Sequence, residues 1–91
     1  MSDSKIILLV EVPVKADSLE DVKTLCARTL VPTLAEPGCE AFYQTSKPDD
    51  PTTLVFFEVF VSQQSLDQHL SAPYTKAFFA SIQDKLAGKP I

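Results

Sequence analysis

Two stretches of the chain are almost continuously apolar, and both are predicted to be buried β-strands. Residues 5–14 are rich in Ile, Leu and Val, and Pro13 ends the run because it cannot donate a ladder hydrogen bond. Residues 52–61 form the strongest strand, since β-branched and aromatic residues fill most positions. A third strand is predicted over 39–45, joined to 52–61 by a short polar turn, so the two should form an antiparallel hairpin.

Between the strands predicted at 5–14 and 39–45, the spacing of the apolar residues is that of a helix. Apolar residues recur at three- and four-residue spacing over 19–30. Either Asp17 or Ser18 can be the N-cap, and Asp17 with Glu20 has the spacing of a capping box. Pro32 removes one backbone donor, so it is expected to kink or interrupt this helix. The Pro-Gly pair at 37–38 is a firm stop.

Two further helices are predicted after the last strand. Ser62 can cap a helix over 63–70, and Pro73 suits the first position of another helix that ends by Gly88. The order β-α-β-β-α-α is that of a split βαβ unit. The chain is therefore predicted to be one α+β domain, residues 1–91, of ferredoxin-like type, with an antiparallel sheet and helices on one face.

Both faces of the predicted sheet are apolar, which suggests a second copy of the chain. The strand 52–61 alternates between two almost wholly apolar sets: Leu54, Phe56, Glu58 and Phe60 on one face, Val55, Phe57, Val59 and Val61 on the other. Helices on short connections cover one face only, and the other would be a larger apolar patch than a soluble monomer leaves exposed. We expect a homodimer through the sheet. The alternatives are a monomer that exposes the patch and a different protein partner.

Charge and composition exclude several classes of function. The net charge is −4 and the eight basic residues are scattered, so no basic stripe exists for nucleic acid or for an anionic membrane surface. The longest apolar run, 6–10, is too short to span a bilayer, and no signal peptide is evident, which predicts a cytoplasmic protein. Cys26 and Cys39 are too few for a metal site or disulfide framework and are expected to be buried small hydrophobes.

His69 and Glu58 are the first candidates for chemistry. His69 is the single histidine, and Leu66 and Leu70 place it on a buried helical stripe facing the sheet. Glu58 is a carboxylate in an apolar strand, so it needs a partner or a raised pKa. We expect Glu58 to hold and orient His69 as a base. The alternatives are a core histidine bonded to backbone, and a Glu58 paired with a basic residue or placed at a dimer seam.

The remaining side chains and motifs give weaker evidence for a functional site. Tyr43 and Tyr74 are the only phenols, and each either lends a hydroxyl to a pocket or packs in the core with one polar tip. Two glycines leave no phosphate-cradling loop, one histidine cannot support a His-rich metal site, and no Gly-x-Ser-x-Gly motif is present. We therefore expect no metal.

Four segments, 30–43, 57–60, 66–73 and 76–78, together resemble the antibiotic biosynthesis monooxygenase (ABM) domain family. The specific parts are the Glu-Pro-Gly-Cys turn at 36–39 and the order of Glu58 followed by His69. The resemblance implies a dimeric α+β barrel with a pocket between sheet and helices in each subunit. It implies oxidation of phenols or quinols by molecular oxygen without metal, flavin or other cofactor.

The resemblance also implies site residues. Glu58 and His69 match pocket residues of the family and are expected to be catalytic. A small aromatic or quinone-like substrate is expected to bind against a set of aromatic side chains: Phe56, Phe60, Phe78, Tyr43 and Tyr74.

Some positions depart from the family. Relatives often carry tryptophan at the Phe60 position and histidine at the Tyr74 position. The lack of Asn, Trp and a last-helix histidine argues against haem degradation, and residues 88–91 leave room only for a short or missing fourth strand.

Two other functions stay open. One is an isomerase of a small phosphorylated signal, for which no basic pocket residue is securely placed, and the other is a dimer that binds a small ligand without catalysis.

Overall fold

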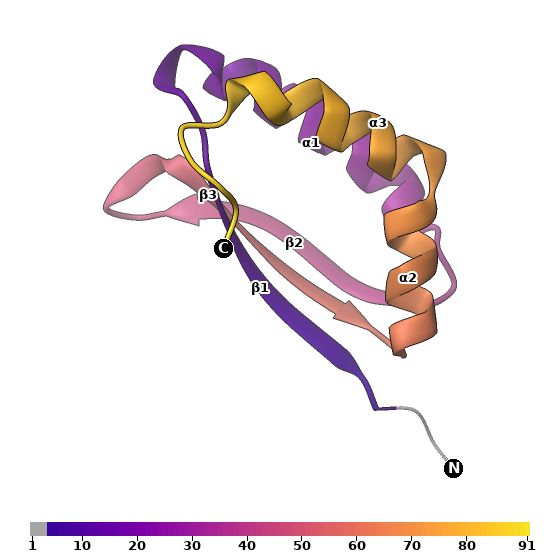
Figure 1. Cartoon of the computed structure of the whole chain (residues 1–91). Helices are drawn as coiled ribbons and strands as arrows, with labels where there is room; N and C mark the ends of the chain where they lie inside the picture. The colour runs from indigo at the N-terminus through magenta and orange to yellow at the C-terminus, as the bar shows by residue number, and fades with distance from the viewer. Residues whose placement is uncertain (1–3) are drawn as a thin grey trace.

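A computed structural model describes residues 4–91 of the chain. These residues form three strands and three α-helices: β1 (Ile6–Pro13), α1 (Leu19–Leu34), β2 (Cys39–Lys47), β3 (Asp50–Phe60), α2 (Gln63–Ser71) and α3 (Pro73–Ile82). The sheet is antiparallel with the order β1-β3-β2, and the three helices lie together on one of its faces (Figure 1). This is the predicted ferredoxin-like α+β arrangement, in two layers.

Helix α1 differs from its prediction at both ends. Pro32 does not interrupt it, because the proline lies in the last turn, where only one backbone hydrogen bond is lost before the helix ends at Leu34. The predicted capping box is wrong, since the N-cap residue is Ser18 and its side chain makes no capping hydrogen bond. A turn of 3₁₀ helix, Ala16–Ser18, leads into α1 instead.

The two later helices begin as predicted. The backbone N–H of Ser65 donates to the Ser62 hydroxyl at 3.2 Å, which caps α2, and Pro73 occupies the first turn of α3. Ala72 between them is extended, so α2 and α3 are separate helices that meet at an angle (Figure 1).

After α3 the chain returns along the free edge of β1. Backbone hydrogen bonds join Lys15 to Lys85 at 2.9 Å, Ala87 to Pro13 at 2.9 Å, and Ile91 to Glu11 at 2.9 and 3.0 Å. The pairing is antiparallel but discontinuous, which agrees with the prediction that a fourth strand is short or missing.

The two faces of the sheet have different surroundings. Leu54, Phe56, Glu58 and Phe60 of β3 are all buried beneath the helices, as one of the two predicted faces. The opposite face keeps large apolar side chains exposed: Ile7 (63%), Leu9 (66%), Tyr43 (65%) and Phe57 (37%). Both faces are therefore apolar, and the described chain covers one of them.

The cysteines are both free thiols, and only one is in the core. Cys26 is buried among the core residues, and burial raises the pKa of its thiol to about 11. Cys39, at the start of β2, is half-buried, so the expectation of a buried residue fails there. Over residues 4–91, no helix has the length and apolar character needed to cross a membrane.

Candidate functional site

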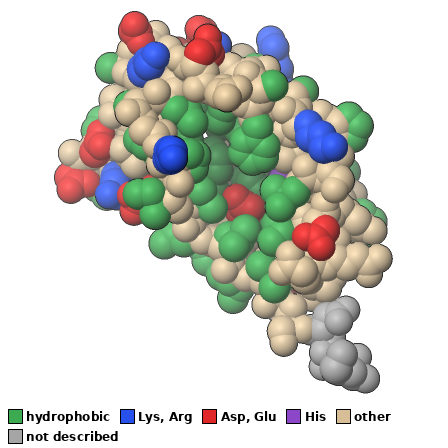
Figure 2. Space-filling view, viewed as in Figure 1, with side chains coloured by type: hydrophobic (Ala, Val, Ile, Leu, Met, Phe, Trp, Pro, Cys, Tyr) green, Lys and Arg blue, Asp and Glu red, His purple; other side chains and the backbone are tan. Residues whose placement is uncertain are grey.

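A cavity of about 160 Å³ lies between the covered face of the sheet and the helices. Its wall is mostly aliphatic and aromatic, with Val10 and Phe56 from the sheet, Leu66 from α2 and Phe78 from α3. Figure 2 shows the hollow lined by hydrophobic side chains, with an acidic side chain inside it. A concave apolar site with few polar groups is typical of small-ligand pockets.

Among residues 4–91, six polar side chains line this cavity: Thr29, Thr33, Gln44, Glu58, His69 and Thr75. The first three donate hydrogen bonds to backbone carbonyls of α1, at 2.9, 2.7 and 3.0 Å. These three side chains therefore already donate hydrogen bonds to partners within the protein. Glu58 from β3 and His69 from α2 keep polar atoms that are available to a ligand, whereas the hydroxyl oxygen of Thr75, from α3, is fully buried.

His69 is held at the cavity wall by Glu36. Its Nδ1 lies 2.9 Å from the Glu36 carboxylate oxygen Oε2, and its ring packs on Phe60 and Phe42 with centroid distances of 5.1 and 5.8 Å. In the neutral imidazole, the carboxylate accepts from Nδ1–H, which leaves Nε2 with its lone pair. The arrangement presents a positioned base to the cavity.

Glu36 in turn is oriented by Tyr74. The Tyr74 hydroxyl donates to the same Oε2 that His69 contacts, and it lies 3.5 Å from the Pro32 carbonyl. Partial burial, and then the adjacent Glu36 carboxylate, raise the pKa of the Tyr74 phenol to about 12, so it stays a donor at neutral pH. Glu36 follows the end of α1 and is the first residue of the Glu-Pro-Gly-Cys turn. The family resemblance rests partly on this turn, but no role was predicted for Glu36.

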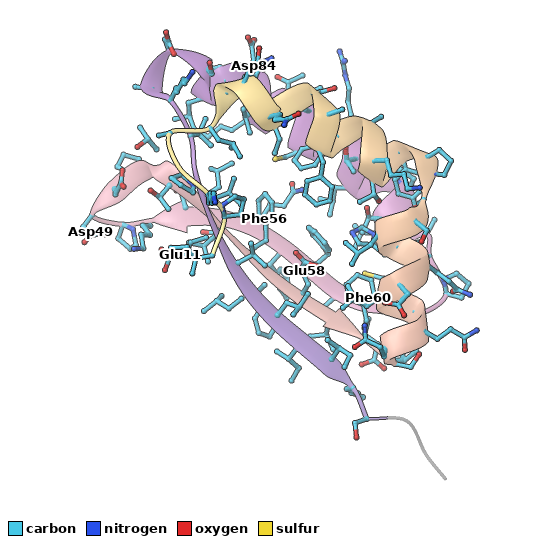
Figure 3. All side chains as sticks on the ribbon, viewed as in Figure 1. Glu11, Asp49, Phe56, Glu58, Phe60 and Asp84 are labelled. Carbon is cyan, nitrogen blue, oxygen red and sulfur yellow. The ribbon has the colours of Figure 1, made fainter. Side chains whose placement is uncertain are left out.

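The expected pairing of Glu58 with His69 is wrong. Phe60 lies two residues further along the same face of β3, and it is the β3 side chain on which the His69 ring packs. Glu58 makes no side-chain hydrogen bond to any described residue, although it is only 7% exposed. Burial raises the pKa of its carboxyl to about 7. Figure 3 shows Glu58 extending from β3 into the space between sheet and helices.

The aromatic residues expected at the site are distributed differently. Phe56 and Phe78 line the cavity, whereas Phe60 supports His69 and Tyr74 holds Glu36. Tyr43 is on the open face, against Phe57 with ring centroids 6.2 Å apart, so the prediction that it binds substrate in this cavity is wrong. Strand alternation explains the difference, because the neighbours of Tyr43 on β2 are the ones that point inward.

The chain resembles a known family and several solved structures. Residues 5–81 match the family described as antibiotic biosynthesis monooxygenase (ABM). A relative from Synechocystis sp. strain PCC 6803, an uncharacterized protein, is 32% identical over 88 residues that cover 94% of this chain. The present chain spans only 58% of that relative's length.

Solved structures match the fold over nearly the full chain. A candidate antibiotic biosynthesis monooxygenase from Nitrosomonas europaea is 21% identical with a TM-score of 0.93, covering 100% of this chain and 88% of that one. A conserved protein from Methanosarcina mazei is 24% identical with a TM-score of 0.92, covering 97% and 87%. At these identities the likeness establishes the fold.

Proposed function

Because this chain belongs to the antibiotic biosynthesis monooxygenase family, we propose that it is a monooxygenase that oxidises a small phenol or quinol with molecular oxygen. The observation that carries the proposal is the free Nε2 of His69, held in place by Glu36 beside an apolar cavity. Such a base suits a substrate whose hydroxyl must lose a proton before it can be oxidised.

The first step is removal of the hydroxyl proton by Nε2 of His69. The positive charge that forms on the imidazole is stabilised by the Glu36 carboxylate 2.9 Å from Nδ1, and Tyr74 keeps that carboxylate in position. The aryl oxide that results is electron-rich and lies in a mostly apolar cavity. These residues bind, orient and deprotonate the substrate.

The electrons come from the substrate. For a hydroquinone, the anion passes one electron to O₂, and the semiquinone and superoxide combine to form a carbon–oxygen bond at the ring. Loss of the ring proton and cleavage of the O–O bond then give a hydroxyquinone and water, with the water taking up a proton from the His69 imidazolium. Hydroquinone plus O₂ thus yields hydroxyquinone plus H₂O, and the four electrons lost by the ring reduce O₂.

The residues that line the cavity favour oxidation of an aromatic substrate over isomerisation of a phosphorylated signal. Among the described residues, the side chains that line the cavity include no lysine or arginine. A phosphate group placed there would lose its hydration without gaining a cationic partner. A neutral aromatic ring matches the apolar wall.

We also propose that the open sheet face binds a second copy of the chain. Ile7, Leu9, Tyr43 and Phe57 are large, apolar and exposed on adjacent strands. An identical face on a two-fold partner would cover them on both molecules at once.

Oxygen uptake with a panel of quinols tests the reaction. We expect His69→Ala to lower kcat/KM roughly 10²-fold or more, as for loss of a general base. The control is Gln68→Ala, on the exposed side of the same helix, which should match wild type. With ¹⁸O₂, one labelled atom should enter the product and one should leave as water. Equal rates for His69→Ala and wild type, or product formed without oxygen, would exclude the mechanism.

A further inference from the structure

Glu58 is a carboxyl group that the fold buries without giving it a partner. It lies in β3 between the buried Phe56 and Phe60 of the same face, is 7% exposed, and makes no side-chain hydrogen bond to a described residue. The cost of removing this carboxyl from water is therefore not offset by a bond within the described chain. A leucine would fill an apolar strand face without that cost, so the carboxyl points to a use outside packing.

The Glu58 carboxyl faces the cavity. Among the side-chain oxygens and nitrogens of residues 4–91, Thr75 Oγ1 alone is both fully enclosed and unbonded. The unbonded oxygens of Glu58 are thus open to the cavity that this residue lines, and so is Nε2 of His69. Figure 2 shows an acidic side chain inside the hollow, and Glu58 is the acidic residue that lines it.

Glu58 and His69 reach the cavity from different layers of the fold. Glu58 comes from the sheet and points toward the helices (Figure 3), whereas His69 comes from α2. The two side chains share no hydrogen bond, because Nδ1 of His69 is held by Glu36. A ligand in the cavity can therefore lie between them and contact both.

The groups around Glu58 keep it protonated. Among the described residues that line the cavity, His69 of α2 is the other titratable side chain, and β1, β2, α1 and α3 contribute none. Burial, and then the Glu36 and Glu58 carboxylates, raise the pKa of the Cys39 thiol at the start of β2, so this neighbour is neutral as well. No cation offsets the burial that raises the pKa of Glu58 to about 7.

A protonated carboxyl offers a ligand one O–H donor. The hydroxyl protons of Thr29 and Thr33 are already donated within α1, and the free nitrogen of His69 is an acceptor. A ligand carbonyl suits the Glu58 donor, because it accepts without bringing a second proton that needs a partner in an apolar cavity. The polar groups of the wall therefore match a ring that carries both a hydroxyl and a carbonyl.

We infer that Glu58 is a ligand-binding residue whose carboxyl donates its O–H to a carbonyl oxygen of the ligand, while His69 Nε2 receives the ligand hydroxyl. The inference rests on the proposed function for the aromatic ligand and for the chemistry at His69. It adds a substrate class: phenols that also carry a ketone or aldehyde group.

The test compares two phenols of the same shape under argon, where no oxidation occurs. One is 4-hydroxyphenylacetone and the other is 4-isobutylphenol, in which an alkyl branch replaces the carbonyl. Calorimetry at pH 6 and pH 8.5 gives the ratio of their Kd values for wild type, Glu58→Gln and Glu58→Leu. Both phenols stay neutral, since a phenol of this kind has a pKa of about 10. Titration of His69 cancels in the ratio, because the two ligands present the same hydroxyl.

The three proteins should differ in a way that a merely structural role of Glu58 would not produce. At pH 6 we expect the ratio in wild type to favour the ketone roughly tenfold more than in Glu58→Leu, which has no donor. At pH 8.5 the ionised carboxyl cannot donate, so wild type should lose this preference. Glu58→Gln donates from its amide at either pH and should keep it. The matched control is Glu11→Gln on the open face, which should behave as wild type.

Several results would overturn the inference. One is the same ratio in wild type and Glu58→Leu at pH 6, and another is a ratio in wild type that does not change with pH. A third is tyramine bound more tightly than the ketone by wild type and not by Glu58→Gln, which would make Glu58 a site for a cation. If Glu58→Leu does not fold, the comparison of wild type with Glu58→Gln across pH still decides.

The same samples separate this inference from the proposed oxidation. If the ratios follow the expectation but quinols and the ketone give no oxygen uptake in air, the oxidation fails and the role of Glu58 stands. If oxygen uptake depends on His69 but the ratios do not depend on Glu58, the inference fails by itself. Wild type that binds neither phenol would contradict both.

Discussion

The two faces of the sheet are made of the same kinds of residue but do different things. A carboxylate lies among apolar side chains on both faces: Glu58 beneath the helices, and Glu11 on the open side. Glu11 pairs with Lys47 at 3.0 Å and stays partly solvated, whereas Glu58 is buried without a hydrogen-bond partner among the described residues. The same alternation therefore yields a cavity on one side and an exposed apolar surface on the other.

This contrast shows that burial, and not residue type, decides the properties of a side chain here. On the covered face, loss of water changes the protonation of a carboxyl, which is useful near a substrate. On the open face, large apolar side chains remain exposed at the cost of solubility unless something covers them. Mutations on each face can separate the two roles.

The largest expected effect is on association through the open face. Phe57→Asp places a charge at the centre of this surface, so we expect wild type to be a dimer and the variant to be a monomer of 10.0 kDa. Light scattering after size exclusion gives both masses. Val31→Asp is the control, because Val31 is also apolar and is exposed (73%), but it lies on α1 and not on the open sheet face. A monomeric wild type, or a Val31→Asp variant that dissociates as well, would contradict the proposed dimer.

A smaller effect is expected from Glu58→Gln on the covered face. Burial raises the pKa of Glu58 from 4.5 to about 7, so the folded state holds this proton more tightly than the unfolded state. Its contribution to stability is greatest below pH 4.5 and falls as the pH rises to about 7, by at most about 3 kcal/mol. Glu58→Gln removes this dependence and should be more stable than wild type at pH 8.

Urea unfolding of the two proteins at pH 4.5 and pH 8 measures this effect. The quantity to compare is the difference in unfolding free energy between variant and wild type, because titration of all other groups cancels in it. A difference that stays constant across this range would show that Glu58 finds a partner or water in the folded protein.

The smallest effect is expected at the charged end of the open face. Glu11→Gln breaks the contact with Lys47, which is a partly exposed ion pair and so contributes little. We expect a small decrease in the unfolding midpoint at low salt that disappears in 1 M NaCl, where charges on a solvated surface are screened. A large decrease that persists in high salt would mean that this end of the face is buried by a partner.

Sequence patterns predicted the elements well and their mutual contacts poorly. The period-two runs placed Leu54, Phe56, Glu58 and Phe60 on one face, and the helix covering that face was predicted with Ser62 at its cap. Yet β2 offers no such guide, because Phe42 and Tyr43 are both aromatic, and only the fold shows that Phe42 turns inward.

By itself, the sequence determined the order of strands and helices, the apolar character of both sheet faces and the family of the chain. Only the tertiary structure decided that His69 bonds Glu36, which is 33 residues away, instead of Glu58. It alone also set the volume of the cavity and left the Thr75 hydroxyl unpaired. The physical reason is that local periodicity specifies which side chains share a face, whereas the partner across a gap depends on how whole elements pack against each other.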